Sequence, residues 1–369
     1  MKNDLPIFAV VTPGLEAIAK KELQKLGISR PKLKGGGFSF RASWIKLCEL
    51  NLCSRVCSGF LVRLGHAHVS HFKALRSFIG KLPWRSYLLN SQVVQLKVTA
   101  KKSKLYHTGA IAERVLQGIQ DTLGHSLAVV SGKDLPAETQ CIVIRLVNNE
   151  LTCSISSSGA HLHRRGYRKV TAKAPIRENI AAGLLMAIGY DGAKPLLDPM
   201  TGSGTFGIEA AMIASNRPPG SGRSFAFMSW KAFDVASWQK LCDEKSKQQI
   251  PVAHQIISSD RNPGALEAAS KNAQLAGLEN IVRFKQNDFS AAIAGLADGW
   301  FCVLNPPYGG RIGGKNLKDL YASFQGLRTT NCKTGIITEN QTLMRKVCGN
   351  FQPISPAIFH GGKRVYFYT

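Results

Sequence analysis

The chain has 369 residues, more than one typical domain, and its 44% of apolar and 19% of charged residues allow two or three buried cores. This composition excludes a disordered or fibrous protein. No run of 18 consecutive apolar residues predicts a membrane span. The formal net charge of +25 favours a polyanionic partner.

The positive charge is concentrated in the first part of the chain. Residues 1–170 contain 26 Lys and Arg against 9 Asp and Glu, whereas the other 199 residues contain 22 against 14. We therefore expect the first part to face a nucleic acid. A generally basic surface without a dedicated partner is the alternative.

The nine cysteines and the clustered histidines predict neither a disulfide framework nor a metal site. An odd number of cysteines in apolar contexts, without CxxC pairs, is typical of reduced thiols. His66, His68 and His71 have no carboxylate or thiol close by in the sequence. The N-terminal apolar run is too short for a signal peptide. The sequence therefore predicts a cytoplasmic protein without a bound metal.

The first 160 residues alternate strand and helix patterns and predict two small α+β units, residues 1–65 and 66–160. In the first unit, strands are predicted at 7–11 and 38–42 and helices at 15–26 and 44–53. In the second unit, helices are predicted at 70–84 and 108–123, a strand at 93–105, and a hairpin at 140–158 that turns at Asn148-Asn149.

Residues 161–369 have a different pattern, in which short apolar strands alternate with longer helices. The predicted strands lie at 194–199, 254–260, 282–288, 301–307 and 333–340, and the clearest helices at 177–190, 206–215 and 264–277. This alternation predicts a doubly wound α/β unit with a mainly parallel sheet. Ligands of such sheets bind at the carboxyl ends of the strands.

The first candidate site follows the strand at 194–199. Asp198 ends that strand, and a glycine turn with Gly202 and Gly204 leads into a helix. Glycine permits positive φ and a close approach of the backbone to a ligand. The spacing formally matches GxGxxG, but the acid that a dinucleotide ribose requires roughly 20 residues later is missing. Capping of the following helix is the structural alternative for Asp198.

Two further strand ends add polar groups to this site. Asp260 can accept hydrogen bonds from ribose hydroxyls, and Asp288 stands where an adenine amino group could be reached. Asp198 is placed to meet an ammonium group. Together these residues favour a cationic ligand that carries a ribose, and S-adenosylmethionine has these features.

The second candidate site is the sequence Asn305, Pro306, Pro307, Tyr308 after an apolar strand. The prolines fix φ and lack N–H donors, so the loop is stiff. The Asn305 side-chain oxygen and the Pro306 carbonyl can accept both hydrogens of one NH₂ group. Such acceptors stabilise the charge that develops when a poorly nucleophilic amine attacks, and Tyr308 can stack on a base. A simple turn is the alternative.

Both motifs, with 257–278 between them, resemble the THUMP-domain RNA guanine-N2 methyltransferases, and the match extends to 161–185 and 225–241. The resemblance implies a ferredoxin-like domain at 1–65, a THUMP RNA-binding domain at 66–160 and a Rossmann-like methyltransferase domain at 161–369.

The resemblance also implies the roles of the site residues. Asp198, Met200, Gly202 and Gly204 would surround the methionine end of S-adenosylmethionine, Asp260 would hold its ribose and Asp288 its adenine, and Asn305 to Tyr308 would hold the target base.

The substrate implied by the resemblance is structured RNA, either ribosomal RNA of the 23S type or tRNA. The basic residues expected to contact it are Lys101, Lys102 and Lys104 beside a predicted strand end and Arg164 and Arg165 at the domain junction.

Several alternatives remain at this point. An adenine-N6 nucleic-acid methyltransferase shares the asparagine-first motif, as does a protein glutamine methyltransferase. A non-catalytic RNA-binding or ribosome assembly factor would keep the basic front half but not the intact pocket. The sequence does not fix the oligomeric state.

Overall fold

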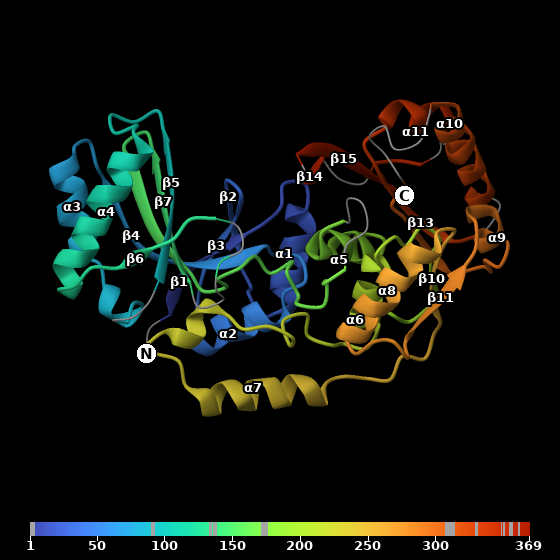
Figure 1. The fold of residues 1–369 in the computed structure, drawn as a ribbon, viewed down its shortest axis with the longest axis horizontal. Helices are drawn as coiled ribbons and strands as arrows, with labels where there is room; N and C mark the ends of the chain where they lie inside the picture. The colour runs from blue at the N-terminus through green and yellow to red at the C-terminus, as the bar shows by residue number, and fades with distance from the viewer. Residues whose placement is uncertain are drawn as a thin grey trace.

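The structure is a computed structural model that describes residues 4–89, 93–132, 135, 139–170, 176–306, 314–328, 331–347, 349, 351–353, 357–360 and 362–369, without the side chains of 314–316, 328 and 347. Within these residues the chain forms an eight-stranded and a seven-stranded sheet. The two sheets lie at opposite ends of an elongated molecule (Figure 1).

The N-terminal sheet has the strand order β2-β3-β1-β4-β8-β7-β5-β6. Its strands are β1 (Leu5–Val10), β2 (Lys32–Lys34), β3 (Gly37–Ala42), β4 (Gly59–His68), β5 (Val93–Lys101), β6 (Ala128–Val129), β7 (Gln140–Val147) and β8 (Glu150–Ser156). Its helices are α1 (Glu16–Lys25), α2 (Trp44–Cys53), α3 (Phe72–Gly80), α4 (Thr108–Leu123) and the short 3₁₀ turn η1 (Trp84–Ser86). The predicted strands and helices of this half are thus confirmed.

Strand β4 was not predicted, yet it is central to the sheet. It pairs with β1 on one side and with β8 on the other, so the expected boundary after residue 65 falls inside it. A bulge between Arg63 and Gly65 breaks the alternation that would have revealed the strand. A side chain at Gly65 would lie 2.7 Å from Leu82 and 2.8 Å from Phe78, so glycine lets α3 pack directly on the strand.

The hairpin between β7 and β8 turns at the predicted Asn148-Asn149. Both residues have positive φ, 54° and 64°, which asparagine tolerates better than most residues. The pairing places Val147 opposite Glu150.

The helices cover one face of this sheet. Ile7, Val62, Ile155 and Ile142 are neighbours across four strands on that face, and each is at most 1% exposed. They share one core with residues of all four helices. Residues of the opposite face are largely polar, as is typical of an antiparallel sheet that faces solvent on one side.

The C-terminal sheet has the order β11-β10-β9-β12-β13-β15-β14. Its strands are β9 (Leu196–Asp198), β10 (Ile256–Asp260), β11 (Val282–Gln286), β12 (Phe301–Leu304), β13 (Lys333–Thr338), β14 (Ile358–His360) and β15 (Lys363–Tyr368). Its helices are α5 (Glu178–Ala187), α6 (Thr205–Ala214), α7 (Val235–Lys247), α8 (Pro263–Leu275), α9 (Phe289–Ile293), α10 (Gly314–Ser323) and α11 (Gln341–Val347), with 3₁₀ turns η2 (Ala226–Ser229) and η3 (Phe324–Arg328). Strands β9 to β13 are parallel, and β15 joins antiparallel.

Apolar cores lie on both faces of this sheet, as expected for a doubly wound fold. Alternate residues of one strand belong to different cores: Val303 packs in the core of α5, α6 and α8, whereas Leu304 packs with α10 and η3. The predicted Rossmann-like α/β architecture is therefore confirmed.

The segment between α6 and α8 returns to the N-terminal sheet. In it, the Trp230 ring packs against Trp44 and Tyr87, and its Nε1 donates to the Gln140 side chain at 2.7 Å. The Phe227 amide donates to the Ser157 carbonyl at 3.0 Å. Helix α7 then packs against α2 and lies along the lower side of the molecule in Figure 1. We call residues 218–247 the strap, because they tie the two halves together.

Candidate active site

Polar residues converge where β9, β10 and β12 end. These strands are neighbours in parallel register, with Asp198 beside Ser258 and Leu197 beside Cys302. Asp198 and Asp260 consequently lie close together at one edge of the sheet, and Asn305 follows the end of the adjacent strand. The predicted clustering of these side chains at the carboxyl ends of the strands is therefore what the fold produces.

The glycine turn between β9 and α6 has the predicted positive φ angles, 54° at Gly202 and 84° at Gly204. Each glycine has a different surrounding. A side chain at Gly204 would lie 3.0 Å from Ala269 of α8, whereas one at Gly202 would meet nothing within 4 Å. Gly204 thus permits helix packing, and Gly202 borders the open side of the site. The amino end of α6 next to it has no side-chain cap.

Asp260 holds the glycine turn. Its Oδ2 accepts a hydrogen bond from the Gly202 amide at 3.0 Å, and its Oδ1 accepts one from the Asn262 amide at 3.0 Å. The side chain remains partly exposed. Because each carboxylate oxygen has further lone pairs, it can still accept from ligand hydroxyls.

Asp198 is fully buried and does not cap α6, which rules out the capping alternative. Burial raises the pKa of its carboxyl to about 7; Thr201 and the Met200 amide oppose this rise, and Asp260 adds to it. Neither Asp198 oxygen makes a well-formed hydrogen bond with any described residue. A buried carboxyl without such partners is costly unless a ligand supplies them.

Further buried polar atoms around Asp198 also find no hydrogen-bond partner among the described residues. They come from the glycine turn and from the ends of β10 and β12: Thr201 Oγ1, Ser203 Oγ, Ser258 Oγ, Ser259 Oγ and Asn305 Oδ1. Native proteins leave few such groups unpaired, so their concentration at one edge of a sheet indicates a site for a polar ligand. Sequence reasoning missed these hydroxyls; small polar residues inside a buried strand were the available signal.

The other predicted cofactor residues border this cluster. Asp288 is exposed and caps α9, with its Oδ1 accepting from the Ala291 amide at 2.8 Å. Met200 is partly buried and packs against the core of α10 and η3.

The predicted target-base residues are described only in part. Asn305 is partly buried, with its Oδ1 among the unpartnered atoms, and Pro306 is buried. Pro307 and Tyr308 lie outside the described residues. The acceptor oxygen of Asn305 therefore stands at the same sheet edge as Asp198 and Asp260.

Asn272 of α8 was not among the site residues predicted from the sequence, yet its side chain holds the glycine turn by a hydrogen bond to Ser203. It is fully buried. Its Nδ2 donates to the Ser203 carbonyl at 3.1 Å and to the Val170 carbonyl at 2.9 Å, and its Oδ1 accepts from the Lys169 and Val170 amides. The turn is thus joined both to α8 and to the segment that enters this half.

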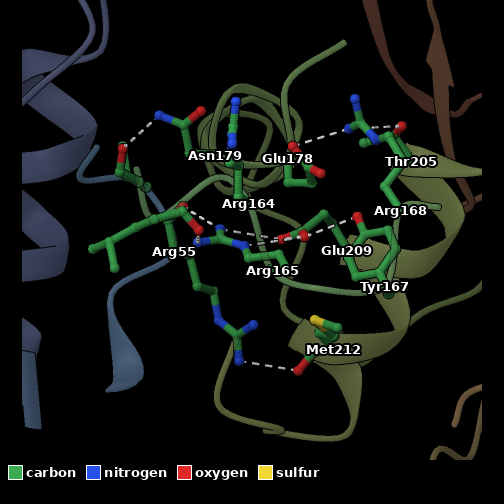
Figure 2. A network of polar contacts seen from close by, with 12 residues as sticks. Arg55, Arg164, Arg165, Tyr167, Arg168, Glu178, Asn179, Thr205, Glu209 and Met212 are labelled. Carbon is green, nitrogen blue, oxygen red and sulfur yellow. Dashed lines mark hydrogen bonds and ion pairs between the residues drawn. The ribbon is translucent and has the colours of Figure 1, made fainter. Parts of the chain in front are cut away.

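A buried ionic network connects α6 to the N-terminal half (Figure 2). The side chains of Arg165 and Glu209 are 2% and 0% exposed and form an ion pair at 3.4 Å. The Tyr167 hydroxyl donates to Glu209 at 3.2 Å. Arg165 also donates to the Leu162 carbonyl. Arg55 extends the network by donating to the Met212 carbonyl at 3.0 Å.

A second ion pair lies beside this network. Arg168 contacts Glu178 at 3.0 Å and donates weakly to Thr205, the first residue of α6, at 3.4 Å. Burial raises the pKa of Glu178 to about 7, while the charge of Arg168 opposes the rise.

The predicted RNA-contacting residues divide into two groups. Lys101, Lys102, Lys104 and Arg164 are exposed. Arg165 is 3% exposed and held by Glu209, so it cannot reach an RNA, and the prediction for this residue is wrong. The sequence did not show this difference, because Arg164 and Arg165 are adjacent, yet Arg164 is exposed and Arg165 is buried.

The clustered histidines serve other purposes. His66 and His68 contact Glu150 at 3.2 and 2.9 Å, and His71 caps α3 by accepting from the Ala74 amide. Among the described residues no group of three or more His, Cys, Asp or Glu is arranged to hold a metal ion.

Within the same residues, no helix is both long and apolar enough to span a bilayer.

The geometry fits a ligand with a cationic group near Asp198, hydroxyls near Asp260 and an amine near Asn305. Such a site can hold two reactants next to one another at a sheet edge. The Asn305 Oδ1 is buried and has no hydrogen-bond partner among the described residues, so it is a candidate acceptor for such an amine.

Two family models match the chain. The model described as an RMKL-like methyltransferase domain matches residues 165–353, and the one described as an RlmL ferredoxin-like domain matches residues 6–58. The second match covers the elements β1 to α2, which agrees with the ferredoxin-like unit expected from the sequence.

Curated relatives resemble the chain along most of its length. A putative RNA methyltransferase from Synechocystis sp. is 33% identical over 319 residues, which are 86% of this chain and 83% of the relative. The ribosomal RNA large subunit methyltransferase K/L of Syntrophotalea carbinolica is 31% identical over 364 residues, 93% of this chain but 51% of the relative. The chain thus spans about half the length of the K/L relatives.

Solved structures resemble the whole chain. A putative methyltransferase in complex with SAH has a TM-score of 0.88 at 28% identity, covering 100% of this chain and 98% of the other. A predicted N6-adenine-specific DNA methylase from Listeria monocytogenes has a TM-score of 0.84 at 27% identity, covering 99% and 96%.

Proposed function

Because the chain belongs to the RMKL-like methyltransferase family, we propose that it methylates the exocyclic N2 amino group of a guanosine in RNA, with S-adenosylmethionine as the methyl donor. The RNA is ribosomal RNA of the 23S type or tRNA. The observation that carries the proposal is the group of unpartnered buried polar atoms shared by the glycine turn and Asn305.

The cofactor proposal is supported by the chemistry of the residues present. Asp198 offers a buried carboxylate for the ammonium group of the methionine moiety, and Asp260 offers acceptors for the ribose hydroxyls while it holds Gly202. Gly202 leaves space for a ligand beside the turn, and the exposed carboxylate of Asp288 can accept a hydrogen bond from the adenine amine. The cofactor supplies a methyl group on a sulfonium, which is a strong electrophile.

The target proposal rests on Asn305 and Pro306. An exocyclic amine is a poor nucleophile because its lone pair is delocalised into the ring. Two acceptors on its hydrogens favour a pyramidal nitrogen and stabilise the positive charge that grows during attack. We propose that Tyr308 stacks on the base.

RNA is favoured over DNA as the substrate by the relatives' names, whereas guanine N2 is proposed from the resemblance of the two motifs to the THUMP-domain RNA guanine-N2 methyltransferases. Curated relatives are named as RNA and large-subunit ribosomal RNA methyltransferases, and the N-terminal half is strongly basic, as an RNA-binding part should be. The name of the Listeria structure keeps adenine N6 as the second candidate.

We propose the remaining assignments on the same grounds. Residues 1–65 carry the ferredoxin-like unit and 66–160 a THUMP unit that recognises RNA shape. The two units share strand β4, and residues 161–369 form the methyltransferase domain. The protein acts in the cytoplasm, which is consistent with the eight described cysteines all being free thiols.

The test is methyl transfer from labelled S-adenosylmethionine to unmethylated transcripts of large-subunit ribosomal RNA and tRNA, to DNA and to protein in parallel. Digestion of the labelled RNA should yield N2-methylguanosine. Label recovered as N6-methyladenosine or as methylglutamine would replace the substrate assignment. Asn305→Ala is the control for contaminating activity, and an absence of label in every acceptor would favour a non-catalytic RNA-binding factor.

A further inference from the structure

We propose that the open face of the N-terminal sheet, on β4, β5, β7 and β8, binds the phosphate backbone of the RNA, and that this surface continues to the domain junction at Arg177. This inference rests on the proposed function, since it identifies where the same substrate docks. Of the residues predicted from the sequence to contact RNA, this surface keeps Lys101 and Arg164, and it adds cations of the sheet face to them.

Strand register brings the cations of this face together. Lys97 on β5 lies beside Val143, which lies beside Ser154, which lies beside Arg63 on β4. One row further, Thr99 is followed by Arg145 and Thr152. Because cross-strand neighbours point to the same side of a sheet, these side chains all stand on the face opposite the helices.

The cations on this face are available to a ligand. Lys97, Lys101 and Arg145 are exposed. Arg63 is partly buried: it lies 4.2 Å over the Phe8 ring and donates to Ser154 at 2.9 Å. Its guanidinium is therefore fixed in place, and a fixed guanidinium loses little entropy when it binds a phosphate.

The sheet curves around this face. Arg145 on β7 donates to the carbonyl of Gly35, in the turn between β2 and β3, at 3.4 Å. That turn belongs to the opposite end of the strand order, four strands away. The exposed Lys32 and Lys34 on β2 are thereby brought towards the same face.

The surface continues from the sheet to the entrance of the methyltransferase domain. His161 lies between the two halves, and although its side chain reaches solvent, partial desolvation lowers its pKa and the charges of Lys97 and Arg177 lower it further. Lys97 belongs to β5 and Arg177 precedes α5, so cations of both halves lie near enough to His161 to affect its pKa. Exposed Arg164 adds to this junction.

Charge complementarity identifies the occupant. Of the described strand residues on the open face of β4, β5, β7 and β8, Glu150 is the only carboxylate, and it is already engaged by His66 and His68. A surface with several cations, hydroxyls of Thr99 and Thr152, and one acid that two histidines already contact suits a phosphodiester backbone.

The test compares two triple variants of the full-length protein that lose equal charge. The first, Lys97→Gln, Lys101→Gln and Arg145→Gln, changes exposed residues of the open face. The matched control, Lys231→Gln, Lys240→Gln and Lys247→Gln, changes exposed residues of the strap, which packs on α2 on the helical side of the sheet. The probe is an unmethylated large-subunit ribosomal RNA transcript, whose dissociation constant is measured over a range of KCl concentrations.

We expect the open-face variant to raise the dissociation constant about tenfold or more at moderate salt and to reduce the slope of log K against log[salt] by about 2–3, since each lost phosphate contact removes nearly one unit. The strap variant should stay within about twofold of the wild type. The KM for RNA should rise in the open-face variant while kcat at saturating RNA and the affinity for S-adenosylhomocysteine stay unchanged. Ultraviolet cross-links of wild-type protein to the RNA should map to peptides of β4, β5 and β7.

Unchanged RNA affinity in the open-face variant, or an equal loss in both variants, would overturn the inference while leaving the proposed function intact. Weakened binding to duplex DNA with unchanged binding to RNA would also overturn it. The proposed function fails separately, if wild-type protein transfers no methyl group to RNA. Circular dichroism and thermal unfolding of both variants verify that neither has lost its fold.

Discussion

The carboxylate of Asp260 accepts a hydrogen bond from the amide of Gly202 at 3.0 Å. A residue expected only to hold the cofactor ribose therefore also shapes the turn that lies next to the cofactor. Ligand and loop share one side chain, so a change at this position acts on both.

Replacing Asp260 by alanine should weaken S-adenosylhomocysteine binding by about 1–3 kcal/mol, because the Gly202 and Asn262 amides lose their acceptor along with the ligand. Asp260→Asn retains one acceptor oxygen and should lose less. Titration calorimetry measures both. Reduced dinucleotides should not compete, and saturable NADH binding at the same site would refute the choice of cofactor.

Cofactor affinity should increase with pH up to about 7. Asp198 in the free protein keeps its proton to a pKa of about 7, because it is buried, whereas in the unfolded chain it ionises near its ordinary value. Between these two pKa values the unfolded chain is ionised while the folded chain is still protonated, so the stability of the ligand-free fold falls as the pH rises. A bound ammonium group offsets this loss, because it stabilises the charged carboxylate in the folded protein. Below pH 7 the affinity should fall by up to about tenfold per pH unit.

The measurement is S-adenosylhomocysteine affinity between pH 5.5 and 7.5, together with the rise in Tm that the ligand causes at each pH. Asp198→Asn should lower the affinity at pH 7.5 and remove most of its pH dependence. A wild-type affinity that is flat across this range would contradict the pairing of Asp198 with a cationic group.

Asn305→Ala should reduce single-turnover methyl transfer by about 10²–10³ or more, the usual effect of losing a preorganised hydrogen-bond partner of the transition state. The fold should be little affected, because the Asn305 Oδ1 has no partner among the described residues. S-Adenosylhomocysteine affinity should hardly change. Asn305→Asp, which keeps an acceptor and adds charge, should retain partial activity, and an equal loss of binding and rate in Asn305→Ala would refute its role at the base.

Glu209→Ala should lower the free energy of unfolding by about 3–5 kcal/mol, because it leaves the charge of Arg165 buried without its partner. Urea denaturation measures this loss. The double variant Arg165→Met with Glu209→Leu should be considerably more stable than Glu209→Ala, since no buried charge remains. Equal losses in both would mean that Glu209 acts through the Tyr167 hydroxyl or through packing instead.

The catalytic half was predictable because its strands are short, apolar and end in polar residues. Asp198, Asp260 and Asn305 each follow such a strand, and the rule that ligands bind at the carboxyl ends of strands then places them together. What each glycine does was not predictable, since Gly204 packs on α8 and Gly202 faces open space, and sequence alone does not tell which neighbour a backbone atom meets.

The N-terminal half was less predictable. Strand β4 was missed because its bulge at Gly65 and the polar residues after it disturb the period of two. Arg165 was assigned to the surface because a local arginine doublet resembles a basic patch, and its partner Glu209 is 44 residues further along the chain. Burial set by such distant partners leaves no local pattern.

The position of β4 affects how this protein can be divided. One strand belongs at once to the ferredoxin-like order β2-β3-β1-β4 and to the pairing with β8. A cut after residue 65 would remove the last residues of a central strand and expose the edge of β8. The two N-terminal units therefore have to be exchanged together when genes recombine. A gene fusion that replaced only one unit would need a new strand in the position of β4, paired with both β1 and β8.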